Sequence, residues 1–151
     1  MHKQNGVAEM KYVPKLILLF ALTLLFINGC SEKPEKKNDI ISVIKDNLKY
    51  AENEDLDKLM STIDEQSPQY ASTEKIMKRI FKVYDLTYKL ESIKVIEKSD
   101  DKAKVNFVQV TMKRNGPTFR NNKITGVHTL FKTDGTWNIY ITKIDKMEYL
   151  N

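Results

Sequence analysis

The chain has 151 residues and a formal net charge of +5, from 25 basic and 20 acidic side chains, and one cysteine, Cys30. This length suits a single domain with a modest core. One cysteine excludes an intrachain disulfide and a cysteine-rich metal cluster. The lysines are interspersed with acidic residues and no nucleic-acid-binding motif is found, so we expect no nucleic-acid partner.

An apolar run near the N-terminus extends from Leu16 to Ile27, follows Lys11 and Lys15, and is interrupted only by Thr23. Its roughly twelve residues fit the core of a secretory signal peptide and fall short of the ~20 that span a bilayer as a helix. Because the basic flank stays in the cytoplasm, we expect the rest of the chain to be translocated. An uncleaved transmembrane anchor is the alternative.

The run ends in Ile27-Asn28-Gly29-Cys30, which resembles the lipobox of bacterial lipoproteins, although Asn28 is a less usual occupant than Ala or Ser. The resemblance implies cleavage before Cys30 and a diacylglyceryl group on its thiol. Two acyl chains hold a protein stably on a bilayer. We therefore expect a lipid-anchored protein on the extracytoplasmic face of the cell membrane. The lysine-rich, glycine-poor composition favours a Gram-positive-type surface.

These signals divide the chain into three parts. Residues 1–29 form the expected signal peptide, with Met1 and Met10 as alternative starts, so that 1–9 can be a start-codon artefact. Residues 30–38 are the lipidated cysteine and a polar tether. Residues 39–151 form the folded domain. Because residues 1–29 hold three lysines and one glutamate, the remaining 122 residues have a net charge of +3.

Apolar residues recur at helical spacing after residue 39. Asn38 or Asp39 is suited to cap a first helix that continues to about residue 51. Asn53 or Asp55 is suited to cap a second, shorter helix, which we expect Ser67-Pro68 to end because proline cannot continue the hydrogen-bond ladder.

A third helix is expected to begin with Ser72 or Thr73 as its cap. Its apolar residues follow helical spacing, and we expect them to face the core. They are Ile76, Met77, Ile80, Phe81 and Val83.

The apolar period then changes from about 3.6 to 2, which predicts strands. We expect four, over residues 86–97, 103–113, 123–132 and 137–149. A phase slip near Glu91-Ser92 predicts a bulge, and Asp134-Gly135 predicts a hairpin turn. The predicted fold class is therefore α+β, with three N-terminal helices packed on one face of a curved four-stranded antiparallel sheet.

From about Asp39 to Leu150 this element order resembles the nuclear transport factor 2-like superfamily, the cone fold of SnoaL-like, ketosteroid-isomerase-like and cystatin-like domains. Two stretches add to the resemblance, YAENEDLDKLMSTIDEQSP and the hairpin GVHTLFKTDGTWNIY. The superfamily hosts enzymes, ligand binders and dimerisation modules. The resemblance thus implies the cone, a ligand pocket and a homodimer through the open sheet face, but no particular activity.

His128 is the one histidine after the signal segment. A catalytic interpretation pairs it with Asp64 or Asp85 as an acid/base dyad, and a structural strand histidine is the interpretation that we favour. One histidine with scattered carboxylates does not make a metal site. We expect no metal and no other cofactor.

Two further groups of residues are weaker candidates for ligand binding. Tyr84 and Tyr88, near the start of the first strand, could line the mouth of a cone beside Asp85, as the tyrosine and acids of isomerase-like members do. Arg120 lies in a polar loop that could hold an anionic ligand or headgroup. Packing and turn formation are the alternatives for both groups.

We therefore expect a membrane-anchored lipoprotein whose cone domain is a non-catalytic module that binds a small ligand or an envelope protein. The candidate binding residues are Tyr84, Tyr88, His128 and Arg120, and Cys30 is the lipidation site. A SnoaL-like or isomerase-like pocket enzyme is one alternative. An envelope assembly or immunity factor is the other.

Overall fold

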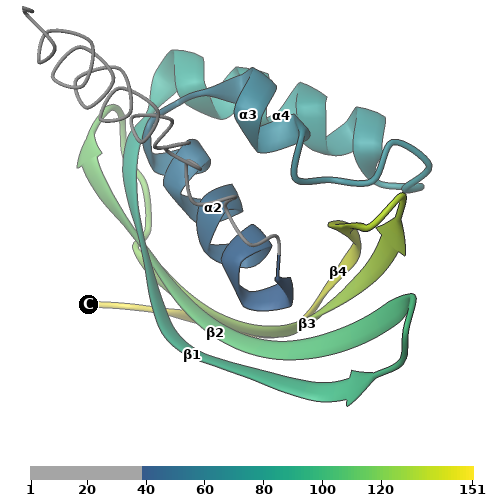
Figure 1. Cartoon of the computed structure of the whole chain (residues 1–151). Helices are drawn as coiled ribbons and strands as arrows, with labels where there is room; N and C mark the ends of the chain where they lie inside the picture. Colours follow the sequence, from purple (N-terminus) through teal and green to yellow (C-terminus); the bar gives the residue numbers. More distant parts are fainter. Residues whose placement is uncertain (1–38) are drawn as a thin grey trace, which may run out of the picture. The chain divides into compact units, whose positions relative to one another are not determined.

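The computed structural model describes residues 39–151, so the expected signal peptide, lipobox and tether lie outside the described residues. No helix in 39–151 is long and apolar enough to cross a membrane. The described elements confirm the predicted α+β class (Figure 1). In chain order they are α2 (Ile40–Glu52), α3 (Leu56–Met60), α4 (Tyr70–Val83), β1 (Asp85–Lys98), β2 (Lys102–Asn115), β3 (Asn122–Thr133) and β4 (Thr136–Tyr149).

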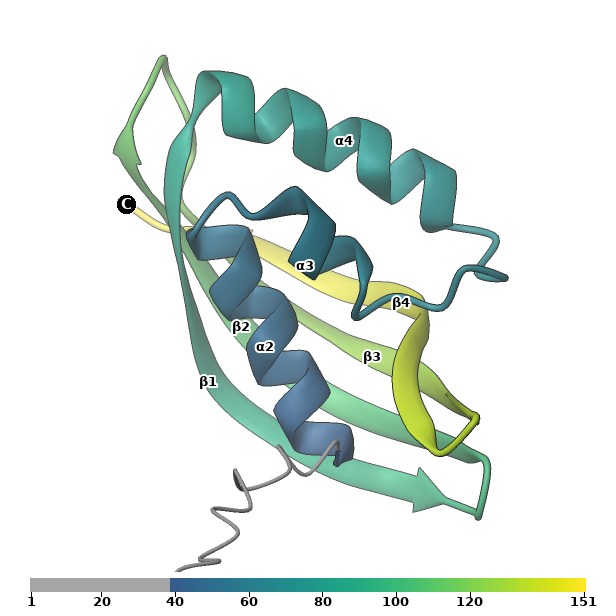
Figure 2. The ribbon, with the colours of Figure 1, turned by 45° about the horizontal axis from the view of Figure 1, so that its top comes forward.

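The four strands form one antiparallel sheet in the order β1-β2-β3-β4. The register of β1 shifts between Leu90 and Ser92, which confirms the predicted bulge. Two further shifts lie in β4, opposite Thr129/Leu130 and Thr125/Gly126. Bulges bend and twist the strand that carries them. They account for the curve with which the sheet wraps around α2 (Figure 2).

Helix α2 lies in the concave face of this sheet. The Asp39 carboxylate accepts hydrogen bonds from the amides of Ile41 (2.9 Å) and Ser42 (2.8 Å), so Asp39 is the cap. The helix packs an apolar stripe onto the sheet and forms the first apolar cluster. This cluster consists of Ile40, Val43, Ile44, Ala103, Val105, Leu130, Trp137 and Ile139.

Helix α3 is shorter than the sequence predicts. It begins after Asp55 as expected but ends at Met60, so the prediction that Ser67-Pro68 ends it was wrong. The chain leaves the helix because it pairs with β4 instead: the Ile139 amide donates to the Thr62 carbonyl, and the Asp64 amide donates to the Ile139 carbonyl, both at 2.9 Å.

Helix α4 begins two residues before the predicted caps. Gln69 precedes it without a side-chain cap, and the Ser72 hydroxyl donates back to the Gln69 carbonyl (2.9 Å). The prediction that all its apolar residues face the core was also wrong, since Ile76 is 56% and Val83 42% exposed. The helix lies beside α3, away from α2, and packs by one side only (Figure 2).

That side of α4 joins a second apolar cluster. Its buried members are Ala51, Leu59 and Met60. Its partly buried members come from all three helices, the segment after α3 and the first strand. They are Tyr50, Leu56, Ile63, Tyr70, Met77, Phe81 and Tyr88.

Gly126 provides a test of how closely the curved strands pack. A Cβ there would overlap the Lys143 carbonyl oxygen and lie 3.0 Å from the Phe107 ring. We expect Gly126→Ala to lower the free energy of unfolding by about 2 kcal/mol, measured by denaturant titration of the fluorescence of Trp137, the one tryptophan.

Gly135→Ala is the matched control. Its Cβ would meet nothing within 4 Å, but φ is +81°, so we expect a loss of only about 1 kcal/mol from backbone strain. Equal losses in the two variants would contradict the close packing at Gly126.

Candidate functional site

Polar side chains are buried inside the cone, between the two apolar clusters. This polar belt consists of Thr62, Ser67, Gln109, Thr111 and His128, and each is at most 8% exposed. Along β2, the polar belt begins after Val105, which belongs to the first cluster, and ends at Thr111. Thr111 pairs with Tyr88 of β1, which belongs to the second cluster. Buried polar groups need hydrogen-bond partners, so each member restricts what can lie beside it.

A cavity of about 210 Å³ opens beside this belt, and we take it as the candidate site. Its lining comes from α2, the segment between α3 and α4, the start of α4, and β4. No charged residue is among them. The lining residues are Asn47, Ile63, Ser67, Gln69, Thr73, Ile139, Tyr140 and Thr142.

Asn47 enters the cavity from the inner face of α2. It lies three residues after Ile44 and four after Val43, both buried against the sheet. Its Nδ2 donates to the Thr62 hydroxyl (2.7 Å), which in turn donates to the Leu59 carbonyl (2.6 Å). No hydrogen bond within residues 39–151 uses the Asn47 Oδ1, which leaves an acceptor at the wall of the cavity.

Gln69 forms the next part of the wall, and its side-chain amide pairs with β4 as the backbone of a neighbouring strand would. Its Nε2 donates to the Thr142 carbonyl (3.2 Å), and its Oε1 accepts from the Thr142 amide (2.9 Å). A side-chain amide has the same donor and acceptor as a peptide group, so it can pair with the backbone of β4. Ser67 supports it, because its hydroxyl donates to the Tyr140 carbonyl and accepts from the Gln69 amide (3.0 Å).

His128 lies behind Thr142, in the middle of the sheet. Its ring is stacked on Phe107 with centroids 4.1 Å apart, and its Nδ1 shares a 2.9 Å hydrogen bond with the Thr142 hydroxyl. Burial lowers the pKa of His128 to about 4, so the imidazole is neutral near pH 7. It therefore orients the Thr142 hydroxyl as an uncharged group.

Neither carboxylate suggested as a dyad partner of His128 approaches it as an acid/base partner. Asp85 pairs with Asn115, ten residues along β2 from the Val105 that adjoins His128, a distance of ~33 Å. Its carboxylate accepts from Arg114 at 2.8 Å. The Asp64 carboxylate accepts from the Gln66 amide (2.8 Å) and lines a separate surface pocket.

The other predicted binding residues lie away from the cavity. Tyr84 packs against Phe119, with ring centroids 5.5 Å apart, and the guanidinium of Arg120 lies 3.6 Å from the centre of the Tyr149 ring. Tyr88 is part of the second apolar cluster, where burial first, and then Glu52 and Glu54, raise its pKa to about 12. The structure therefore does not bring Tyr84, Tyr88, His128 and Arg120 into one site.

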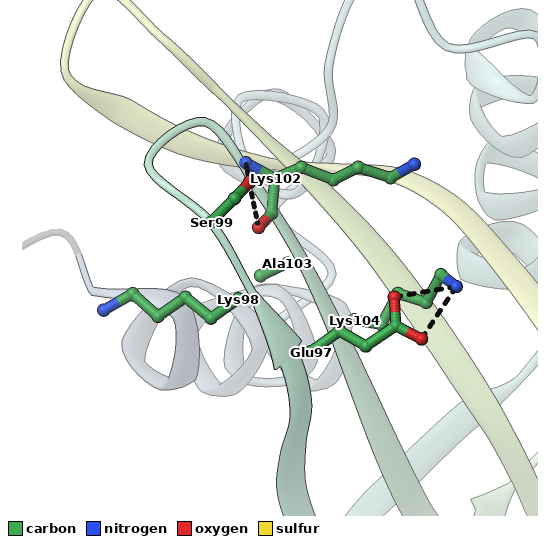
Figure 3. Close-up of a pocket in the computed structure, with 6 residues that line it drawn as sticks. All are labelled: Glu97, Lys98, Ser99, Lys102, Ala103 and Lys104. Atoms are coloured by element: carbon green, nitrogen blue, oxygen red, sulfur yellow. Dashed lines mark hydrogen bonds and ion pairs between the residues drawn. The ribbon is translucent and has the colours of Figure 1, made fainter.

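Two other hollows are weaker sites. One of about 190 Å³ lies at the β1–β2 hairpin, where Lys98 points away from Lys102 and Lys104, and Lys104 is paired with Glu97 (Figure 3). The other, of about 450 Å³, lies at the surface between the segment after α3 and the β3–β4 hairpin. No group of three or more metal-ligating side chains occurs in residues 39–151.

The three helices gathered on a curved four-stranded sheet define a nuclear transport factor 2-like cone. A nuclear transport factor 2-like protein from Pseudomonas putida superposes with a TM-score of 0.59 over 72% of this chain and 84% of its own, at 8% identity. Bd1075 from Bdellovibrio bacteriovorus gives a TM-score of 0.60 over 70% of this chain and 38% of its own, at 17% identity. These likenesses show the fold alone.

The family is shown by the sequence. Residues 42–150 match the model of the C-terminal domain of the anti-sigma-I factor RsgI9, and the chain belongs to this family. RsgI9 of Acetivibrio thermocellus is 44% identical over 78 residues, which are 52% of this chain. The matched part is only 11% of the length of RsgI9.

The buried histidine predicts a pH dependence of stability. The folded-state pKa of His128, about 4, lies below its ordinary value of 6.5, so between these values the unfolded chain binds more protons. The stability contributed by the neutral imidazole is complete above pH 6.5 and falls by about 3 kcal/mol as the pH drops to 4.

Other groups also titrate in this window, so His128→Gln is the reference. We expect denaturant titrations to show wild type losing stability relative to the variant as the pH falls from 6.5 to 4. Parallel stability curves for the two proteins would mean that His128 is not buried as described.

Proposed function

We propose that this chain is an extracytoplasmic lipoprotein, held at the cell membrane through Cys30, whose cone domain binds a neutral hydroxyl- or amide-bearing group and does not transform it. The observation that carries the proposal is the lining of the cavity, which offers hydrogen-bond donors and acceptors without a charge. The lipobox-like ending of the apolar run supports the anchor.

The uncharged lining selects among ligands. A charged group that enters the cavity loses its hydration and finds no counter-ion, which is costly. A hydroxyl or amide instead finds the free Asn47 Oδ1, the Thr73 hydroxyl and the second N–H of the Gln69 side-chain amide, whose first N–H is bonded to Thr142. The same neutrality disfavours acid/base catalysis, because His128 is not paired with a carboxylate and its pKa is far below 7.

The size of the cavity restricts the ligand further. About 210 Å³ is less than the roughly 300–1,000 Å³ that enclose whole drug-sized ligands. The cavity therefore suits one end group of a longer molecule, such as a sugar ring or an amide side chain, with the remainder outside. Polymers of the cell envelope, and polymers outside the cell, carry end groups of this kind.

Family membership supports binding, and not catalysis, as the function of this chain. RsgI9 is named an anti-sigma-I factor, which describes a regulator. We propose for this chain the binding step of such a system, in which the anchored domain detects a molecule outside the membrane.

The cavity is tested with neutral probes, N-acetylglucosamine and N-acetylalanine amide, and with acetate and methylammonium as charged counterparts. A probe at ten times its dissociation constant adds about 1.4 kcal/mol to the free energy of unfolding. We expect thermal denaturation to show this gain for a neutral probe in wild type and its loss in Asn47→Leu.

Asp64→Asn is the control, because Asp64 lines the surface pocket and not the cavity. It should respond to the probes as wild type does. Stabilisation by the charged probes alone, or an undiminished response in Asn47→Leu, would overturn the proposed site.

The anchor is tested by the mass of the mature N-terminus. We expect wild-type protein from membranes to begin at Cys30 and carry a diacylglyceryl group, whereas Cys30→Ser should retain residues before Cys30 and lack the lipid. Asn28→Ala keeps the lipobox pattern and should be processed as wild type is. An unlipidated wild-type protein that retains the apolar run would contradict lipidation and leave the cavity proposal standing.

A further inference from the structure

Strand β4 is an edge of the sheet, and the chain covers only its first half. Thr62 and Asp64 pair with Ile139, and the Gln69 amide pairs with Thr142. Within residues 39–151 no hydrogen bond from another segment reaches this edge between residues 143 and 149, and every residue from 143 to 151 is exposed. An uncovered edge presents unpaired backbone groups to any other strand.

The covered half of β4 shows which residues of the free edge direct their backbone amide and carbonyl groups outward, away from β3. The amide and carbonyl of Thr142 point outward, to Gln69. Backbone groups alternate along a strand, so those of Ile144 point outward as well. The register shift between Ile144 and Lys146 inserts Asp145 as an extra residue, which moves the next outward position to Met147.

The side chains follow the same phase. Ile144 lies opposite Gly126 and Met147 opposite Ile124, so both are on the concave face, and each is 49% exposed. The charged residues between and around them alternate in sign, in the order Lys143, Asp145, Lys146, Glu148. An exposed apolar pair within alternating charges is a pattern that can pair with itself.

We propose that residues 143–148 of two copies of this chain pair as antiparallel edge strands, with Ile144 of each copy opposite Met147 of the other. Both residues present outward backbone groups and concave side chains, so the pairing satisfies the hydrogen bonds and the faces together. It places Lys143 opposite Glu148 and Asp145 opposite Lys146 of the second copy. Each opposed pair has opposite charges, which stabilises strand pairing.

Every neighbouring register is unfavourable. A shift by one residue sets Asp145 or Lys146 against its own copy, depending on the direction. A shift by two sets Lys143 against Lys146, or Asp145 against Glu148. Like charges directly opposite each other destabilise a sheet. The charge order therefore selects one register and a second copy of this chain, whereas a foreign strand would need no self-complementary order.

The charges have partners within the single chain as well. Lys143 lies 3.0 Å from Asp145, and Lys146 lies 2.9 Å from Glu148. These pairs are exposed, and exposed ion pairs contribute little. Pairing of the edges would exchange them for pairs across the strands. The interface uses neither the cavity nor the sheet face.

The test exchanges the two charges of one cross-strand pair in the full chain, in detergent, with sedimentation velocity as the measurement. We expect a dimer for wild type, and a dissociation constant roughly tenfold higher for Lys143→Glu or Glu148→Lys alone, because each single change opposes like charges at two symmetric positions. We expect the double exchange to restore the dimer.

The double exchange separates this proposal from a role of the charges within one chain. It opposes like charges in both intrachain pairs, so an intrachain role predicts that the double variant is the worst of the three. Rescue by the double exchange supports edge pairing. A wild-type chain that stays monomeric at every concentration, or a dimer insensitive to all three variants, overturns it.

A disulfide trap gives a second readout. We expect Ile144→Cys combined with Met147→Cys to form covalent dimers on oxidation, above the background of the wild-type chain. Lys89→Cys combined with Lys94→Cys, on the β1 edge, is the control and should stay at background. Equal crosslinking of the two variants would overturn the proposed register.

Discussion

The packing of α2 into the curve of the sheet is the contact on which the other features depend. Ile44, Val105 and Leu130 are at most 1% exposed, and full burial of such a side chain contributes about 1.5–3 kcal/mol. The helix has only 13 residues, however, and fills one part of the concave face. The remainder has to be closed by other parts of the chain, and that closure creates both the cavity and the uncovered edge.

The closing segment between α3 and α4 is not helical, so its backbone groups need partners elsewhere. The edge of β4 supplies them at Ile139, whereas at Tyr140 and Thr142 it pairs with side chains of the segment. Side chains of Ser67 and Gln69 complete this pairing, and they bring polar atoms into the interior with them. The neutral lining of the cavity thus follows from the way in which a loop is fixed to a strand, without any charged group being buried.

Local patterns predicted the parts of this fold that local interactions determine. Asp39 caps α2 as expected, and Asp134 and Gly135 both have positive φ, as the hairpin turn requires. The lengths of α3 and α4 could not be predicted, because Ile63 pairs with Ile139, which lies 76 positions later. A contact of that range leaves no trace in helical spacing. Pro68 would stop a helix, but the pairing of Ile63 with β4 ends α3 before the chain reaches it.

The candidate site also combines features that local sequence predicts with features that depend on long-range contacts. The residue types of Tyr84 and Arg120 suit ligand binding, but both residues pack at the β2–β3 end of the sheet, with Phe119 and Tyr149. The cavity is formed by residues from separate elements, and only Asn47 gave a sequence signal, as an amide on an otherwise apolar helix face. The pairing of Gln69 with Thr142 could be found only in three dimensions.

Gln69 connects the two surfaces of the domain. One amide both lines the cavity and ends the covered half of the β4 edge. Because this amide occupies Thr142, the free edge begins at Lys143 and offers six residues before Tyr149, whose ring is covered by Arg120. So short a strand has few backbone hydrogen bonds with which to fix a register. The order of its four charges must therefore select the register, which the backbone hydrogen bonds of a longer edge would help to fix.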